Sequence, residues 1–242
     1  MNEQFSELCG KGKLNEAKQL LEANPDIIST CHFFWACFNG HLEVAQWLLQ
    51  IKPDINISIN NEEMFRSVCY NGHLLVAQWL LQVKPDIDIS INNEEVFRLA
   101  CGKGHLLVVQ WLLQVKPDID ISANDEYAFR SACYDGHLLV AQWLFQVPKK
   151  TGRPDINISI DNEYAFRWAC WNGHINVAQW LLQIKPDINI SADNEFAFSF
   201  ACQNGHLNVA QWLQTLKPYY VIINCDKNGS CKSYYGASLS QH

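Results

Sequence analysis

Histidine and cysteine are the residues of this chain whose chemistry and spacing first suggest a catalytic or metal site. Six histidines each follow a glycine, at spacings of 32, 32, 32, 37 and 32 residues, and a cysteine stands three residues before each of these glycines. A catalytic site needs unlike groups that converge on one point, whereas a fixed spacing translates identical residues along a stack. We therefore assign both columns to the scaffold, with each histidine holding the turn of its own unit. The columns are His41, His73, His105, His137, His174 and His206, and Cys37, Cys69, Cys101, Cys133, Cys170 and Cys202.

Other signatures of catalysis or metal binding do not occur in the sequence. The stretch 10–13, Gly-Lys-Gly-Lys, lacks the spacing of a phosphate loop, and there is no Gly-x-Ser-x-Gly elbow. The pairs Cys31/Cys37 and Cys225/Cys231 lack a second ligand pair at zinc spacing, so a metal or disulfide at Cys225/Cys231 is only a minor alternative. The sequence predicts a protein that is not an enzyme and that needs no cofactor and no metal.

Composition and cysteine placement narrow the class further. The 242 residues are 48% hydrophobic and carry a net charge of −7, which does not favour nucleic acid as a partner. No apolar run is long enough for a membrane span, and the first residues lack the features of a signal peptide. Equivalent cysteines on stacked helices would lie about 8–10 Å apart, too far for a disulfide. Free thiols indicate a reducing, intracellular compartment.

The elements that position these columns are two short helices in each unit. In residues 162–173, Asn162 is expected to cap the first helix, an apolar stripe follows at helical spacing, and Gly173 ends it. A pair between Glu163 and Arg167 at i,i+4 is expected on the polar side, as are Glu62/Arg66, Glu94/Arg98 and Glu126/Arg130. The second helix is predicted from His174 to Ile184, with Trp180 packed inward, and an extended segment follows Pro186.

These units predict an all-α repeat solenoid with short extended fingers between the repeats. We expect an array over residues 1–223, made of an atypical N-terminal unit, 1–28, and six units that start near residues 29, 61, 93, 125, 162 and 194. A basic insertion, 148–153, is expected to be a loop. The remainder, 224–242, shows no periodicity and is expected to be an irregular tail.

The motif Gly-His-Leu-x-Val-Ala-x-Trp-Leu-Leu, followed by Pro-Asp-Ile-Asn, resembles the ankyrin repeat over about residues 3–223. It looks closest to the divergent ankyrin arrays of large DNA viruses of amoebae, which would place the protein in host–virus interaction. The family's Thr-Pro-Leu-His appears here as Tyr164-Ala165-Phe166-Arg167. The hydrogen bond between the family's Thr and His is therefore absent, and we expect the arginine column to make different contacts.

The resemblance implies that a partner protein docks on the concave face, which the fingers and the exposed side of the first helices build. The two positions before each Gly-His vary most between units, and several are aromatic, as interface anchors are. The alternative is that these rings only cover neighbouring helices. Trp35, Leu99, Trp168 and Phe200 also vary, and we expect them to be partly buried. The predicted protein-binding residues are Phe38, Tyr70, Asn71, Lys103, Tyr134, Asp135, Trp171, Asn172, Gln203 and Asn204.

The sequence thus predicts a monomeric, non-enzymatic scaffold for protein–protein interaction. Acidic residues at the helix starts could give its binding side a negative potential and a preference for a basic partner. Two alternatives stay open. The chain could be an adaptor that recruits host proteins to a ubiquitin-ligase-type pathway through its tail, or a structural component that assembles end to end through its terminal repeats.

Overall fold

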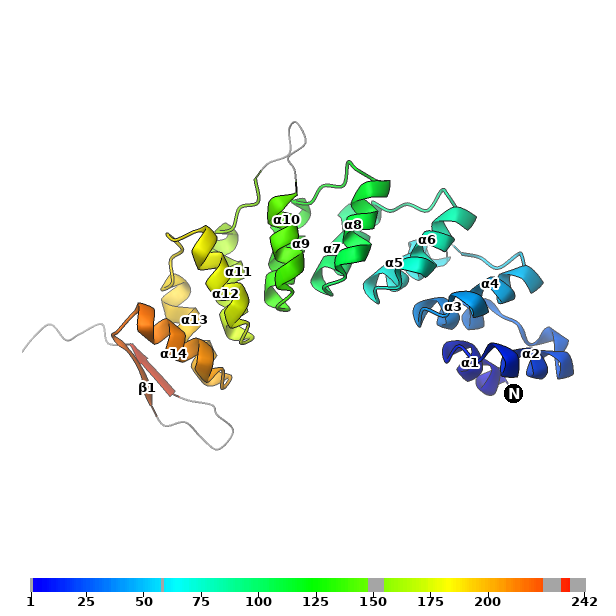
Figure 1. Ribbon diagram of the computed structural model, residues 1–242, viewed down its shortest axis with the longest axis horizontal. Coiled ribbons are helices and arrows are strands. Elements are labelled where there is room, and N and C mark those ends of the chain that lie inside the picture. The colour runs from blue at the N-terminus through cyan, green and yellow to red at the C-terminus, as the bar shows by residue number, and fades with distance from the viewer. Residues whose placement is uncertain (1, 58, 148–154, 224–231, 236–242) are drawn as a thin grey trace, which may run out of the picture. The chain divides into compact units, whose positions relative to one another are not determined.

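The computed structural model describes residues 2–57, 59–147, 155–223 and 232–235, with residues 26, 59–61 and 232–235 described by their backbone alone. The predicted basic loop, 148–153, and the Cys225/Cys231 pair lie outside these ranges. The chain forms two compact units, residues 1–119 and 120–242, and each is described by itself. Both are built from pairs of helices (Figure 1), and the predicted all-α repeat solenoid is confirmed.

In the first unit, four helix pairs follow one another along the chain. Each second helix packs against the first helix of its own pair, and the first helices of successive pairs also pack together. A short 3-10 helix, η1 (Pro25–Ile27), follows the first pair. The pairs are α1 (Asn2–Gly10) with α2 (Leu14–Ala23), α3 (Thr30–Phe38) with α4 (Leu42–Ile51), α5 (Ile59–Tyr70) with α6 (Leu74–Val83), and α7 (Ile91–Gly102) with α8 (Leu106–Val115).

The second unit contains three further helix pairs and, at its end, two short strands. The first helices α9, α11 and α13 pack side by side. The pairs are α9 (Ala123–Tyr134) with α10 (Leu138–Gln146), α11 (Ile160–Trp171) with α12 (Ile175–Ile184), and α13 (Ala192–Gln203) with α14 (Leu207–Leu216); the strands are β1 (Tyr220–Ile223) and β2 (Lys232–Tyr235).

The core of each pair comes from the apolar stripes that the sequence predicts. In the pair α9–α10, Phe129, Ala132 and Cys133 of the first helix and Ala141 of the second are fully buried. The indole of Trp180, from the next pair, lies 6.2 Å from the Phe129 ring. The predicted inward packing of this tryptophan is confirmed, and Trp180 joins the pair α11–α12 to the pair α9–α10.

Histidines of the column connect neighbouring repeats. The ring of His41 makes a hydrogen bond from Nε2 to the Gly10 carbonyl oxygen at 3.0 Å. A Cβ placed on Gly12, whose φ is +71°, would lie 2.5 Å from His41 Nδ1, so only a glycine leaves room for the ring. His105 bonds the Tyr70 carbonyl in the same way, at 2.8 Å. The expectation that each histidine holds the turn of its own repeat was wrong for His41 and His105, because each of them bonds the turn of the preceding repeat.

A left-handed turn lies within the first residues of the first helix in several repeats. Asp161, Asn162 and Glu163 have φ angles of 53°, 55° and 63°, and the equivalent residues of α7, α9 and α13 do the same. Asn and Asp tolerate this conformation better than other residues with a Cβ. The predicted N-cap at Asn162 was wrong, because this residue lies within the left-handed turn and the cap position falls on Ser159.

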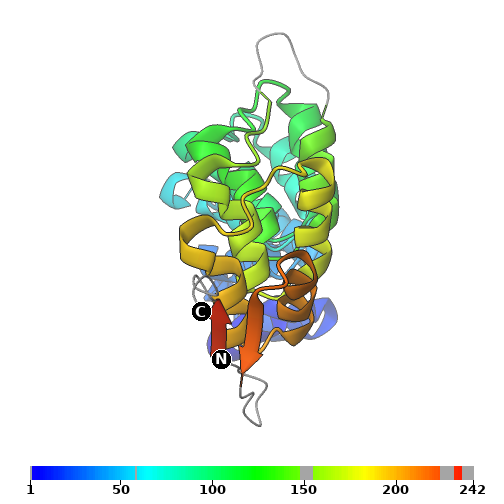
Figure 2. The same cartoon turned by 90° about the vertical axis from the view of Figure 1, so that its left-hand side faces the viewer.

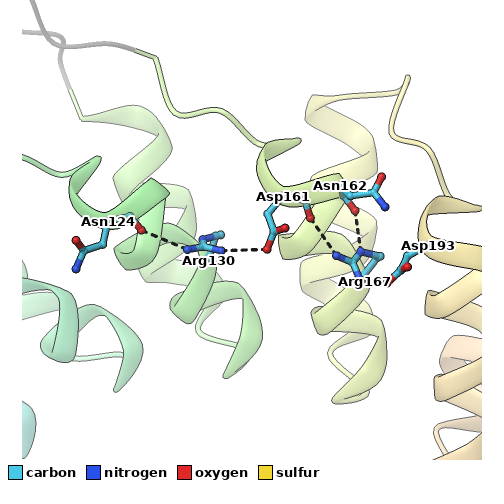
Figure 3. A network of polar contacts seen from close by, with 6 residues as sticks. All are labelled: Asn124, Arg130, Asp161, Asn162, Arg167 and Asp193. Carbon is cyan, nitrogen blue, oxygen red and sulfur yellow. Dashed lines mark hydrogen bonds and ion pairs between the residues drawn. The ribbon is translucent and has the colours of Figure 1, made fainter.

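The arginine column binds these left-handed turns. Arg167 donates from Nε to the Asn162 carbonyl at 2.7 Å and from Nη2 to the Asp161 carbonyl at 3.0 Å. Its Nη1 reaches the Asp193 carboxylate of the next pair at 2.7 Å (Figure 3). Arg98 bonds the Asn93 carbonyl at 2.8 Å. The expectation that the arginines make contacts different from the family's is confirmed.

The predicted i,i+4 pairing was wrong for Glu126/Arg130 and Glu163/Arg167, whose side chains have other partners. Glu163 Oε1 accepts the backbone N–H of Asn189, in the next finger, at 3.3 Å, while Arg167 turns to Asp193. Glu126 likewise accepts the N–H of Asn157 at 3.2 Å. In the first unit, Arg66 pairs with Glu95, and Ser90 Oγ donates to Glu94, which is buried. The left-handed turn rotates the glutamate toward the finger, away from the arginine four residues later.

The end of the second unit is a β-hairpin. Strands β1 and β2 pair antiparallel, with Tyr220 opposite Tyr235, and lie side by side (Figure 2). β2 also packs against α13. The prediction of an irregular tail over 224–242 was therefore wrong for residues 232–235. An isolated two-stranded hairpin is marginal in water, and the helix beneath the strand supplies the support that the local sequence does not show.

Candidate functional site

Seven aromatic side chains gather on the first helices of the second unit, and we call this group the aromatic surface. In α11, Tyr164, Trp168 and Trp171 stand at i, i+4 and i+7, which places them on one side of the helix. The neighbouring helices α9 and α13 each contribute two rings at equivalent positions. The aromatic surface consists of Tyr127, Tyr134, Tyr164, Trp168, Trp171, Phe196 and Phe200.

Trp168 lies at the centre of the aromatic surface. Its ring centroid is 5.5 Å from that of Tyr134 and 5.5 Å from that of Tyr164. It is 4.7 Å from Trp171, which in turn stacks on Phe200 at 4.4 Å. Ring pairs at these separations stabilise one another by about 0.5–1.5 kcal/mol beyond their buried area. Six of the seven rings therefore form a connected, preorganised set, and Phe196 joins it through Trp168 and Phe200.

A hollow of about 420 Å³ opens between α9 and α11 at one end of the aromatic surface. It has four aromatic walls, three of them tyrosines, and one aspartate, one arginine and one serine. Pockets of about 300–1,000 Å³ are the usual size for specific ligand groups. The hollow is lined by Tyr127, Arg130, Ser131, Tyr134, Asp135, Tyr164 and Trp168.

The charged groups of the hollow are held in place by their neighbours. The Arg130 guanidinium lies over the Tyr164 ring, 4.8 Å from its centroid. Arg130 also donates to the Asn124 carbonyl at 3.2 Å and pairs with Asp161 at 3.4 Å (Figure 3). Burial raises the pKa of the Tyr164 phenol above its ordinary value. This hydroxyl therefore stays neutral at physiological pH, and the Asp161 carboxylate balances the charge of Arg130.

The predicted binding residues of the second unit lie on or beside the aromatic surface. Tyr134 and Trp171 are half-buried members of it, and Asp135 lines the hollow. The amide of Asn172 donates to the Tyr134 carbonyl at 3.0 Å, and that of Asn204 donates to the Trp171 carbonyl at 3.1 Å. These two asparagines tie neighbouring helix pairs together. The remaining predicted residue of this unit, Gln203, is exposed.

The predicted binding residues of the first unit lie on α3 and α5 and in the turns that follow α5 and α7. Phe38 is half-buried and packs on Trp35 at 5.3 Å. The exposed Lys103 ammonium lies over the Tyr70 ring, 5.1 Å from its centroid, and Asn71 donates to the Ser67 carbonyl at 2.8 Å.

The four residues expected to be partly buried differ in their exposure. Leu99, Trp168 and Phe200 are half-buried, which confirms the expectation for these three. Trp35 is 41% exposed, so the expectation for this residue was wrong.

Three members of the aromatic surface escaped the sequence analysis. Tyr127, Tyr164 and Phe196 each directly follow a glutamate at the start of the first helix, where we expected only caps and solvated charge. The same position holds Glu63 and Glu95 in the first unit. The sequence did carry a signal for these residues. In three successive copies an aromatic ring replaces the glutamate at this position, which in α11 is four residues before Trp168.

Among the described residues, no group of three or more His, Cys, Asp or Glu side chains could hold a metal ion, and no helix there combines the length and apolarity of a membrane span. The eight cysteines within those ranges are free. Burial raises the pKa of the Cys9 thiol to about 12 and that of Cys202 to about 11, so these thiols stay protonated.

Comparisons with known proteins agree with this architecture. The family model for ankyrin repeats in many copies matches residues 33–81, 97–145 and 129–182, together more than half of the chain. The crystal structure of the human ASB11 ankyrin repeat domain is similar with a TM-score of 0.54 and 15% sequence identity, over 80% of this chain and 95% of that one. No curated protein sequence matches. At this identity the solved structure supports the fold alone, whereas the family match is broad and follows the repeat, so the chain belongs to the ankyrin-repeat family.

Proposed function

We propose that this protein is a non-enzymatic scaffold that binds a partner protein through its aromatic surface. Ankyrin repeats typically mediate protein–protein interaction, and the exposed side of the first helices is where partners of the family usually dock, on the concave face. The observation that carries the proposal is the set of rings on α9, α11 and α13, six of which are linked by ring contacts. The seventh ring, Tyr127, lines the hollow and is 40% exposed. Tyrosine, tryptophan and arginine are the residues that dominate binding energy at interfaces.

The regularity of the remaining sequence supports this assignment. The glycine, histidine, cysteine and tryptophan columns serve the contacts within and between helix pairs, as His41 and Trp180 illustrate. The aromatic surface uses positions at which the copies differ, and its rings are grouped in one of the two units. A surface with this aromatic content, set on rigid helices, has little entropy to lose when it is covered.

The experiment that tests the proposal compares two single substitutions of equally exposed rings in the same unit. Tyr127→Ala removes a ring of the aromatic surface, and Phe145→Ala removes a ring of α10 that is 41% exposed. The immobilised variants are incubated with lysate of the relevant cell, and captured proteins are quantified against the wild type. We expect Tyr127→Ala to reduce capture of the specific partner about tenfold or more, which corresponds to about 1.4 kcal/mol, and Phe145→Ala to retain it.

Thermal unfolding of both variants serves as the control for folding, since both rings are exposed to the same extent. Equal capture by Tyr127→Ala and the wild type, with Phe145→Ala also unchanged, would show that the partner does not use the aromatic surface. Loss of capture only in Phe145→Ala would move the interface to the second helices.

The setting of this interaction is part of the proposal. We propose that the chain acts as an intracellular monomer in a reducing compartment and that its partner is a host protein met during viral infection. Support comes from the free cysteines among the described residues and from the likeness of the Asn-Gly-His-Leu and Lys-Pro-Asp-Ile-Asn motifs to viral arrays. β2 also covers α13, which disfavours end-to-end assembly through that side of the second unit.

A further inference from the structure

We propose that the hollow between α9 and α11 accepts a basic side chain, lysine or arginine, of the partner protein. The inference rests on the proposed function, because it names the chemistry of the group that the aromatic surface would bind. Its three supports are the ring faces of the hollow, a cation that the first unit supplies and the second does not, and the balance of charge around Arg130.

The rings of the hollow are of the kind that binds cations. The face of a tyrosine or tryptophan ring carries negative potential and attracts ammonium and guanidinium groups within about 6 Å of the centroid. The protein already uses such faces, since the guanidinium of Arg130 lies 4.8 Å from the Tyr164 centroid and that of Arg167 lies 4.9 Å from the Phe196 centroid. Among the rings that line the hollow, Tyr164 is covered by Arg130. No cation of the described residues lies over Tyr134 or Trp168.

The first unit shows what the second one lacks. Tyr70 occupies the same repeat position as Tyr134, and its ring is covered by the ammonium of Lys103 at 5.1 Å. Lys103 stands directly before a repeat glycine, and the equivalent residue for Tyr134 is Asn172. The Asn172 amide turns to the Tyr134 carbonyl at 3.0 Å and carries no charge. The place that an internal cation fills beside Tyr70 is therefore left for an external one beside Tyr134.

The charges around the hollow favour a cation as well. Arg130 contributes one positive charge, which its pairing with Asp161 at 3.4 Å balances. Asp135 adds a second carboxylate to the lining. The nearby Arg167 is likewise paired, with Asp193 at 2.7 Å. An incoming ammonium or guanidinium thus meets ring faces and one carboxylate in excess, and this complementarity selects a basic over an acidic side chain.

The experiment titrates the full chain with a short peptide and its uncharged isostere. The probes are acetyl-Gly-Arg-Gly-amide, acetyl-Gly-Lys-Gly-amide and acetyl-Gly-citrulline-Gly-amide, and the readout is the indole N–H signal of Trp168 in ¹⁵N-labelled protein, assigned with Trp168→Phe. We expect both basic peptides to shift this signal saturably with a Kd of about 1 mM, up to a peptide concentration of about 10 mM. The citrulline peptide should bind at least about fivefold more weakly.

One matched pair of variants and a third substitution locate the effect. Asp135→Asn should weaken binding of the arginine peptide about fivefold, whereas Asp125→Asn, which removes the same charge at the other end of α9, should change it less than twofold. Asn172→Lys should supply the internal cation that Lys103 supplies to Tyr70, and it should block the peptide response of Trp168 in a protein that still unfolds cooperatively.

Equal binding of the arginine and citrulline peptides, or no saturable shift of Trp168 with either basic peptide, would overturn the inference. So would equal effects of Asp135→Asn and Asp125→Asn. These failures are distinguishable from failure of the proposed function. If Tyr127→Ala still abolishes capture of the partner while the peptides show no charge preference, the aromatic surface binds a protein through apolar contacts and only the basic side chain is excluded.

Discussion

Arg167 has to be an arginine because of the turn that it binds. Its planar guanidinium donates to the carbonyls of Asp161 and Asn162 and also to the Asp193 carboxylate. The left-handed conformation of residues 161–163 costs about 1–2 kcal/mol per residue. The turn aims two carbonyl groups at one point, and a guanidinium, with several donors in a rigid fork, can bond both of them together with a carboxylate. The arginine column therefore offsets the strain of a turn that would otherwise be unstable.

Replacement of Arg167 by lysine should destabilise the protein although it keeps the charge. Arg167→Lys retains one flexible donor group and loses the fork, and Arg167 is buried, so carbonyls would be left without partners. We expect a loss of about 1–3 kcal/mol in the free energy of unfolding, measured by urea denaturation. Arg130→Lys is the matched control, because Arg130 makes longer contacts at 3.2 and 3.4 Å and should cost less. An equal or larger loss in the control would contradict this account.

At the scale of elements, the helices and the glycine turns were predictable, but the connections before and after them were not. Phe129, Ala132 and Cys133 show the helical spacing directly, and they are buried as that spacing requires. The stretch Asp161-Asn162-Glu163 has the composition of an ordinary helix start. As a left-handed turn it is bound by Arg167 and linked to the next helix pair, and the composition of the stretch itself does not show these contacts.

The hairpin was missed for a similar reason. Strand β2 holds only four residues in a polar segment, and its pairing with β1 and its contact with α13 come from different parts of the chain. Tyr220 occupies the place that the tryptophan of the following repeat occupies elsewhere in the array. Its ring stacks on Phe198 at 4.1 Å, just as Trp212 packs on Phe166 at 6.3 Å. The hairpin thus supplies the side chain that a further repeat would have contributed.

Two adjacent tyrosines test the role of the hairpin. Tyr220 is 0% exposed and its hydroxyl donates to Glu195, whereas Tyr219 is 44% exposed. Tyr220→Ala should lower the free energy of unfolding by about 3–5 kcal/mol, as other buried aromatic truncations do, and Tyr219→Ala should cost less than about 1 kcal/mol. Urea denaturation followed by circular dichroism measures both. Similar effects of the two substitutions would show that the hairpin does not close the core.

At the scale of the whole molecule, the aromatic surface exists only because helix pairs stack. The sequence shows that Tyr134 and Trp171 vary between copies, but these residues stand 37 positions apart. It does not show that Trp168 lies between them, at 5.5 Å from one and 4.7 Å from the other. Repeat identity could be predicted from spacing, and the grouping of rings across three repeats could not, because it depends on which sides of neighbouring helices face each other.

The pH dependence of stability also belongs to the whole array, because the free energy of unfolding of a repeat stack is approximately a sum of contributions from its repeats. Burial lowers the pKa of His32, His73 and His174 below the ordinary 6.5. Above that pH the histidines are neutral in the folded and unfolded states. Below it the unfolded chain binds protons first, so these groups contribute stability that is lost as pH falls through their folded pKa values. Burial raises the pKa of Glu126 above 4.5, and its contribution has the opposite sign, present at low pH and lost as pH rises.

We therefore expect the free energy of unfolding to fall as pH is lowered below about 6.5, with a slope of at most about 1.4 kcal/mol per pH unit for each titrating group. His32→Gln removes one of the histidines that resist protonation, because His32 is buried, and should flatten the fall. Glu126→Gln keeps an oxygen that can accept the Asn157 N–H and removes the opposing titration, so it should make the fall steeper. Urea denaturation between about pH 5 and 7.5 separates the two effects. Parallel profiles for both variants and the wild type would mean that neither group titrates differently in the folded state, and the pH response of the array would then have to come from other groups.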